Sequence, residues 1–139
     1  MSHTIESEIF IDAPIEVVWD VVTKPEHVSK WFAPTTFDLR VGGKGIVSAH
    51  GESPLEILTL DKPHSFSYQW TAPDSAGNVS VVAFTLSEEG EKTKLHVAES
   101  TERFAADTDL ISKFAKGHND GWKSFFVSVY QTLIYQLRD

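Results

Sequence analysis

The sequence has no cysteine and only one methionine among its 139 residues. Without cysteine the chain can form no disulfide, no thiolate nucleophile and no metal site built on sulfur. No run of apolar residues approaches the roughly 18 of a membrane-spanning helix. The first residues also lack the charged and apolar segments of a signal peptide. We therefore expect a cytoplasmic protein without a membrane partner.

Basic residues are scarce as well. Twelve Lys and Arg stand against 20 Asp and Glu, which gives a formal net charge of -8 with neutral histidines. This charge repels nucleic-acid phosphates and anionic membranes, so we expect no nucleic-acid partner. Apolar residues make up 41% of the chain. That content and length suit one compact domain, which we predict to cover residues 1–139.

The most regular segment is the last third of the chain. Its large apolar residues recur every three or four positions, as in an amphipathic helix: Trp122, Phe126, Val129, Leu133 and Leu137. This spacing predicts a long helix over about residues 109–137, with Asp107 or Thr108 as its N-cap. Gly117 and Gly121 fall inside it, which indicates either a kink or a close approach by backbone or ligand.

A strand and two short helices are expected at the other end of the chain. Residues 4–11 are rich in β-branched residues and predict a first strand. Pro14 suits the first turn of a helix whose inner face carries Ile15, Val18, Trp19 and Val22. A capping-box pattern at Thr23 predicts a second short helix over residues 24–30, with Val28 and Trp31 turned inward.

Between these ends the hydrophobic period changes to two, and turn-forming residues recur at short intervals. This pattern predicts an antiparallel meander of six strands. Their approximate ranges are 36–41, 45–50, 55–60, 65–72, 78–87 and 92–101.

Alternation along the strands predicts which side chains face the long helix. The inward set is Phe37, Leu39, Val41, Phe66, Tyr68, Trp70, Val82, Phe84, Leu86, Leu95 and Val97. For residues 45–50 and 55–60 the alternation does not decide which side chains face the helix. Glu99 continues the inward parity of the last strand. Its carboxylate must lie near a rim or find a buried polar partner, since burying it unpaired costs several kcal/mol.

The predicted class is therefore α+β: a curved, seven-stranded antiparallel sheet around a long C-terminal helix, with two short helices between the first two strands. Several short motifs occur in a characteristic order: Ala13-Pro14 with Val18-Trp19, Pro25-Glu26 with Trp31, residues 38–43, residues 63–70 ending in Tyr68-Gln69-Trp70, Thr93-Lys94-Leu95, and Gly121-Trp122. In these features the chain resembles the SRPBCC/START-like superfamily with its helix-grip, birch-pollen-allergen-like fold. The resemblance is to the bacterial subgroup akin to the C-terminal domain of the heat-shock chaperone ATPase activator.

The resemblance implies a cavity between the sheet and the long helix, of the kind that holds lipids, polyketides or plant hormones in relatives. It also implies a chaperone as a second kind of partner. In the chaperone activator a separate N-terminal domain does much of the partner binding, whereas the sequence begins directly at the expected first strand. We therefore expect a small-molecule ligand rather than a chaperone partner.

No motif predicts a metal, a cofactor or a catalytic residue. The six histidines show no metal-binding spacing: His3, His27, His50, His64, His96 and His118. Gly42-Gly43-Lys44-Gly45 lies between two expected strands, which favours a tight turn over a phosphate loop. The sequence also lacks a nucleophile-elbow motif.

The inward aromatic residues predict the site. We expect a ligand-binding cavity bounded by Trp31, Tyr68, Trp70, Phe84, Glu99, Trp122 and Phe126, with His50 as a further candidate polar group. The leading hypothesis is binding of an apolar or aromatic small molecule. Two others remain open: a cyclase- or hydrolase-like enzyme in the same cavity, and a chaperone-interacting stress-response module. For the enzyme, an apolar pocket would raise the pKa of Glu99 and make it a general acid or base.

Overall fold

The computed structural model describes residues 4–48 and 51–138. Strand β1 (Thr4–Ile11) is followed by helices α1 (Ile15–Thr23) and α2 (Pro25–Trp31). Six strands come next: β2 (Thr35–Phe37), β3 (Lys44–Ser48), β4 (Glu52–Asp61), β5 (Ser65–Trp70), β6 (Ser80–Glu89) and β7 (Lys92–Ser100). Helix α3 (Thr108–Arg138) ends the described chain. This order is the one that the sequence predicts.

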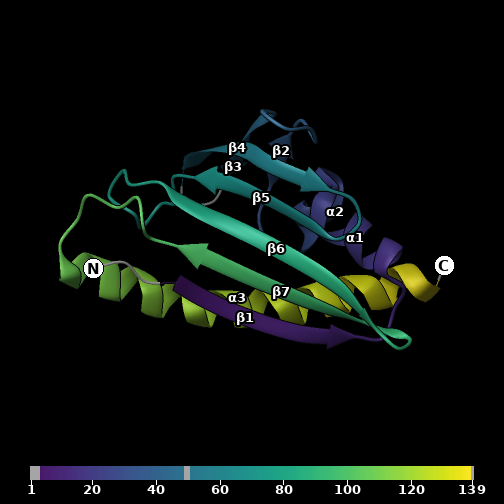
Figure 1. Ribbon diagram of the computed structural model, residues 1–139. Helices are drawn as coiled ribbons and strands as arrows, with labels where there is room; N and C mark the ends of the chain where they lie inside the picture. Colours follow the sequence, from purple (N-terminus) through teal and green to yellow (C-terminus); the bar gives the residue numbers. More distant parts are fainter. Residues whose placement is uncertain (1–3, 49–50, 139) are drawn as a thin grey trace.

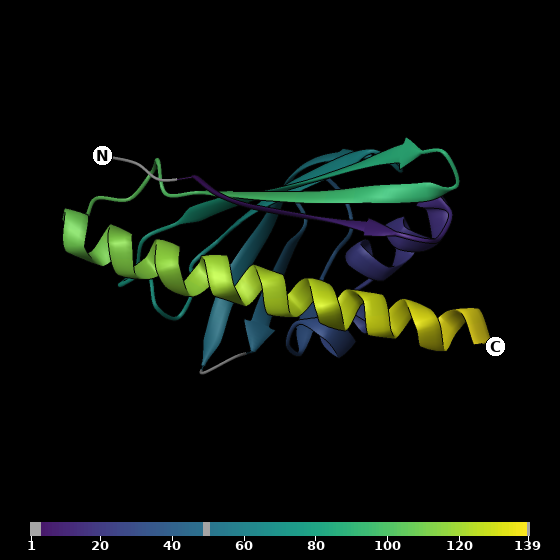
Figure 2. The ribbon, with the colours of Figure 1, turned by 90° about the horizontal axis from the view of Figure 1, so that it is seen from below.

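The seven strands of the described residues form one antiparallel sheet in the order β1-β7-β6-β5-β4-β3-β2. Figure 1 shows the sheet curving above α3, with β1 and β7 nearest to the helix. In Figure 2, α3 runs along one side of the sheet, and α1 and α2 lie beside its C-terminal half. The helix-grip α+β fold expected from the sequence is therefore confirmed. Among the helices of the described residues, none has the length and apolar character needed to cross a membrane.

Alternation along the strands is confirmed where it was clearest. Phe66, Tyr68 and Trp70 are buried while their neighbours on β5 are only partly so. On β4, the inward residues are Leu55 and Ile57. A bulge between Ile57 and Thr59 then shifts the register against β5. Such a shift exchanges the two faces of a strand. This explains why the alternation in the sequence did not decide which side chains of this strand face inward.

The prediction that residues 36–41 form a strand with Val41 inward is wrong beyond Phe37. Strand β2 ends there, and the Val41 side chain is 63% exposed. The chain turns back at once, because the amide of Arg40 donates to the carbonyl of Asp38 and that of Gly43 to the carbonyl of Arg40. Gly43 is required in this turn, since a Cβ there would lie 1.9 Å from the Asp38 carbonyl oxygen.

The N-cap predicted for α3 is confirmed, whereas the one predicted for α2 is wrong. Asp107 caps α3 as predicted, since its Oδ1 accepts from the amide of Leu110 at 2.9 Å. The capping box predicted at Thr23 does not form. The Thr23 hydroxyl instead donates to the carbonyl of Trp19 at 2.6 Å, and α2 begins from Lys24 without a side-chain cap.

Candidate functional site

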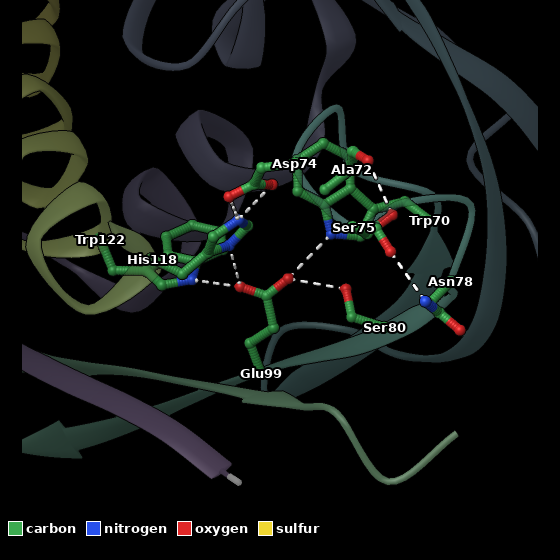
Figure 3. A network of polar contacts seen from close by, with 9 residues as sticks. All are labelled: Trp70, Ala72, Asp74, Ser75, Asn78, Ser80, Glu99, His118 and Trp122. Carbon is green, nitrogen blue, oxygen red and sulfur yellow. Dashed lines mark hydrogen bonds and ion pairs between the residues drawn. The ribbon is translucent and has the colours of Figure 1, made fainter. Parts of the chain in front are cut away.

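Glu99, near the end of β7, has a side chain that is 0% exposed and accepts four hydrogen bonds. Its Oε2 accepts from the indole N–H of Trp70 at 3.0 Å and from the hydroxyl of Ser80 at 2.7 Å. Its Oε1 accepts from Nδ1 of His118 at 2.6 Å and from the indole N–H of Trp122 at 3.0 Å (Figure 3). The buried polar partner that the sequence required is therefore a set of four donors.

Sheet register and helix periodicity bring these donors together. Trp70 and Ser80 are directly paired across β5 and β6. His118 and Trp122 lie four residues apart on α3, so they share one helical face. Glu99 lies opposite that face on β7 and joins the sheet to the helix.

His118 also binds a second carboxylate. Its Nε2 lies 2.9 Å from Oδ1 and 3.0 Å from Oδ2 of Asp74. The imidazole therefore bridges Asp74 and Glu99, and it stacks on Phe114 with ring centroids 3.7 Å apart. Two carboxylate partners require an N–H on both ring nitrogens, which is the protonated form.

The electrostatics agree with this protonation. Burial by itself lowers the pKa of His118, but the hydrogen bonds and charges of Asp74 and Glu99 outweigh it and raise the pKa from 6.5 to about 9. For each carboxylate, burial favours the neutral acid while His118 favours the anion. The net result is that the pKa values of Glu99 and Asp74 lie below their ordinary range.

This result corrects one expectation. Under the enzyme hypothesis, an apolar pocket around Glu99 would raise its pKa and make it a general acid or base. Burial does act in that direction, but His118, Ser80 and Trp122 stabilise the anion more strongly. Glu99 is a charged structural acceptor at neutral pH.

A short loop between β5 and β6 holds Asp74 in place (Figure 3). The hydroxyl of the buried Ser75 donates to the carbonyl of Ala72 at 2.8 Å. The Asn78 side-chain amide donates to the carbonyl of Ser75 at 2.9 Å, and its oxygen accepts from the amide of Ala105. Asp74 is thus presented by a hydrogen-bonded turn that is tied to the segment before α3. We call Trp70, Asp74, Ser80, Glu99, His118 and Trp122 the Glu99 network.

A cleft of about 480 Å³ opens directly beside the Glu99 network. Its walls come from the segment after α2, the end of β5, the following loop and the middle of α3. The lining residues are Phe32, Ala33, Trp70, Pro73, Asp74, Gly117, His118, Gly121, Trp122 and Phe125. We call this space the outer cleft. Apart from Asp74 and His118, every lining residue is apolar or glycine, which is typical of a small-molecule site.

The interior between the sheet and the helices is closely packed by comparison. Phe66 and Phe84 stack with ring centroids 4.8 Å apart, and Trp31 meets Phe84 edge-on. The void beside them has a volume of about 20 Å³, which is space for about one water molecule. Among the described side chains, therefore, this part of the interior has no room for a lipid or polyketide.

The predicted site residues consequently divide into three sets. Trp70, Glu99 and Trp122 meet in the Glu99 network. Trp31, Tyr68 and Phe84 line the small interior void instead. Phe126 is buried against Trp122 and lines neither space. His50 lies outside the described residues.

Sequence reasoning missed several residues of the site. In the sequence His118 was considered only among the histidines that lack metal-binding spacing, although its four-residue spacing from Trp122 was the useful signal. Asp74 lay in an expected turn, and Phe32 followed an expected helix, so neither carried a periodic pattern. The described residues contain no group of three or more side chains that could hold a metal ion.

The two glycines of α3 do not mark a close approach by the backbone or the sheet. The helix continues through both of them. A Cβ at Gly117 would meet nothing within 4 Å, and one at Gly121 would meet only the Phe125 ring at 3.8 Å. Both glycines line the outer cleft, so a ligand is the remaining candidate for the approach.

Gly121→Ala is accordingly expected to raise the free energy of unfolding by about 0.5–1 kcal/mol, because Ala favours the helix and restricts the unfolded chain. Urea denaturation checks this, with Gly117→Ala as the matched variant that should give a similar increase. A decrease for Gly121→Ala alone would contradict the geometry at this position.

Comparisons with known proteins bear on the whole chain. A family model described as Activator of Hsp90 ATPase homolog 1-like protein matches residues 12–133. The comparison with curated proteins gives no significant match.

Three solved structures illustrate the structural similarity. Protein MLL2253 from Mesorhizobium loti is 26% identical, with a TM-score of 0.83 over 96% of this chain and 98% of that one. CalU16 from Micromonospora echinospora is 23% identical, with a TM-score of 0.76 over 99% of this chain and 80% of its own. The Aha1 dimer from Colwellia psychrerythraea is 18% identical, with a TM-score of 0.73 over 94% of this chain and 96% of its own.

Proposed function

This chain belongs to the Activator of Hsp90 ATPase homolog 1-like family, and we propose that it binds an apolar or aromatic small molecule in the outer cleft. The observation that carries the proposal is a cleft of about 480 Å³ whose lining is apolar or glycine apart from Asp74 and His118 and includes four Phe and Trp side chains. Clefts of this size are in the usual range for small-molecule sites.

Hydrogen bonds and ring packing hold the aromatic side chains of the outer cleft in place. Trp70 and Trp122 are each tied to Glu99 through their indole N–H groups. Phe32 packs against both of them, with ring centroids 5.7 Å from Trp70 and 6.0 Å from Trp122. Phe125 meets Phe32 edge-on at 4.7 Å. Rings that are already ordered lose little conformational freedom when a ligand packs on them, which favours binding.

The Glu99 network favours binding over proton-transfer catalysis. An efficient general acid or base has a pKa near the working pH. Here the pKa values of Asp74 and Glu99 are lowered, and that of His118 is raised to about 9. All three groups therefore stay charged at neutral pH, and they hold one another in place rather than exchanging protons with a substrate.

The test is binding of the uncharged fluorescent probe N-phenyl-1-naphthylamine to the wild type and to Gly117→Leu. The new side chain extends from a residue that lines the cleft and whose Cβ meets no neighbour, so it should occupy the cleft without disturbing the core. We expect the Kd to rise at least about tenfold, the loss that a blocked apolar contact of ~1.4 kcal/mol would cause.

Ser124→Leu is the matched control, because it adds the same side chain to an exposed position of the same helix. Its Kd should equal that of the wild type. Equal affinities of Gly117→Leu and wild type would place the probe elsewhere and overturn the proposal. Native mass spectrometry of the protein purified without added ligand would also show whether a small molecule is retained.

A further inference from the structure

The outer cleft has an unequal supply of hydrogen-bonding groups. Three of its lining side chains carry N–H donors: Trp70, His118 and Trp122. Both indole N–H groups are donated to Glu99, and the two nitrogens of His118 are taken by Glu99 and Asp74. None of these described lining side chains has a donor left for a ligand.

An acceptor does remain. The Asp74 carboxylate is 51% exposed, whereas the His118 side chain is 14% exposed and Glu99 is fully buried. A carboxylate has about four lone-pair positions, and the single Nε2–H of His118 occupies only the side between the two oxygens. A hydrogen bond from its own backbone takes up part of the remaining capacity of the carboxylate. Asp74 lines the outer cleft, so what is left of this capacity is available there.

The charges of the Glu99 network also favour a cationic ligand. Asp74 and Glu99 are two anions, and His118 is one cation, so the group carries one surplus negative charge. Because Glu99 is buried against His118, the surplus is presented at Asp74. The neighbouring wall is formed by Phe32, Trp70, Trp122 and Phe125, and the faces of such rings also attract cations.

Resting on the proposed function, we infer that the outer cleft selects a protonated amine carried on a flat aromatic body, with the ammonium group at Asp74. The same arrangement disfavours carboxylate ligands such as fatty acids. A carboxylate would lie beside Asp74 with no free side-chain donor to bind it, at a cost in desolvation and repulsion.

Three probes of nearly equal size test this charge preference. They are 1-naphthylmethylamine, which is protonated at pH 7, uncharged 1-naphthalenemethanol, and anionic 1-naphthoate. Binding is measured by titration calorimetry at low ionic strength. The amine is expected to bind at least about tenfold more tightly than the alcohol, and the acid more weakly than the alcohol.

The Asp74→Asn variant tests the contact between the ammonium group of the ligand and the Asp74 carboxylate. Asn keeps an oxygen acceptor for His118 but removes the charge, so the ratio of amine to alcohol affinity should fall to near one. Asp120→Asn is the matched control: it removes one negative charge from an exposed position of α3 outside the cleft lining, and it should leave the ratio unchanged. This control separates the contact from the general attraction of an acidic protein for cations.

The outcomes distinguish the inference from the proposed function. Alcohol binding that is sensitive to Gly117→Leu, with no advantage for the amine, would overturn the inference and leave the proposed function intact. Tighter binding of 1-naphthoate than of the amine would also overturn the inference and leave the proposed function intact. Failure of all three probes to bind would overturn the inference, and if N-phenyl-1-naphthylamine also fails to bind, the proposed function is overturned as well. If Asp74→Asn does not fold, the wild-type affinities alone still decide the charge preference.

Discussion

Glu99→Ala is expected to lower the free energy of unfolding by about 3–5 kcal/mol, the usual cost of removing one member of a buried ion pair. The carboxylate is fully buried and accepts from Trp70, Ser80, His118 and Trp122. Without it, a charged imidazole and three neutral donors lose an acceptor in the interior. Urea denaturation at neutral pH measures the change.

Two further variants define the cause. Glu99→Gln keeps the shape and one acceptor oxygen but turns an amide toward the donors, so its loss should be smaller than that of alanine. Glu88→Ala removes an exposed glutamate from β6, and its effect should stay within about 0.5 kcal/mol. A Glu99→Ala variant within about 1 kcal/mol of the wild type would mean that the network contributes little to stability.

The stability of the wild type is expected to fall by up to about 3 kcal/mol as the pH rises from 6 to 10. The pKa of His118 is raised from 6.5 to about 9 on folding, so the folded protein keeps a proton that the unfolded chain releases. The stabilisation is complete below the unfolded pKa and is lost as the pH passes through the folded one. Unfolding free energies across this range measure the decline.

At low pH the stability is expected to change in the opposite direction and to fall as the pH is lowered. The pKa values of Asp74 and Glu99 are lowered on folding, so their stabilisation is present above the ordinary carboxyl range and is lost as the pH falls. Stability should therefore be greatest at weakly acidic pH, between the ordinary pKa of a carboxyl group and that of histidine.

His118→Gln assigns the alkaline decline to one residue. The variant should be less stable than the wild type at pH 6, and the difference should shrink toward pH 10. His96→Gln is the matched control, because His96 on β7 pairs with a single carboxylate among the described residues, that of Glu6 at 3.3 Å. That variant should keep the decline. Parallel pH curves for wild type and His118→Gln would contradict the assignment.

Local patterns in the sequence were sufficient for the elements and for most of the core. Period-two alternation placed Phe66, Tyr68, Trp70 and Glu99 inward, because successive side chains of a strand always point to opposite faces. Period 3.6 placed Trp122, Phe126 and Val129 on the buried face of α3. The resemblance drawn from ordered motifs is confirmed by the family match.

Local patterns failed where the backbone departs from a regular period. The turn at residues 38–43 depends on backbone hydrogen bonds within it and to Ile57 of β4, and the bulge after Ile57 lies in the pairing of β4 with β5. Neither feature is visible in the alternation of apolar residues. Val41 was placed on the wrong face for this reason.

The sequence by itself determined that Glu99 would be turned inward and would need a partner, since both conclusions depend only on parity and on the cost of burying a charge. Only the tertiary structure decided which residues supply that partner. Asp74 lies 44 residues from His118, and Glu99 lies 19 residues from it, so no local period relates them. The location of the outer cleft was decided in the same way. Side-chain volumes that fill the interior and leave space beside Trp122 depend on how the sheet, the loop after β5 and α3 pack together.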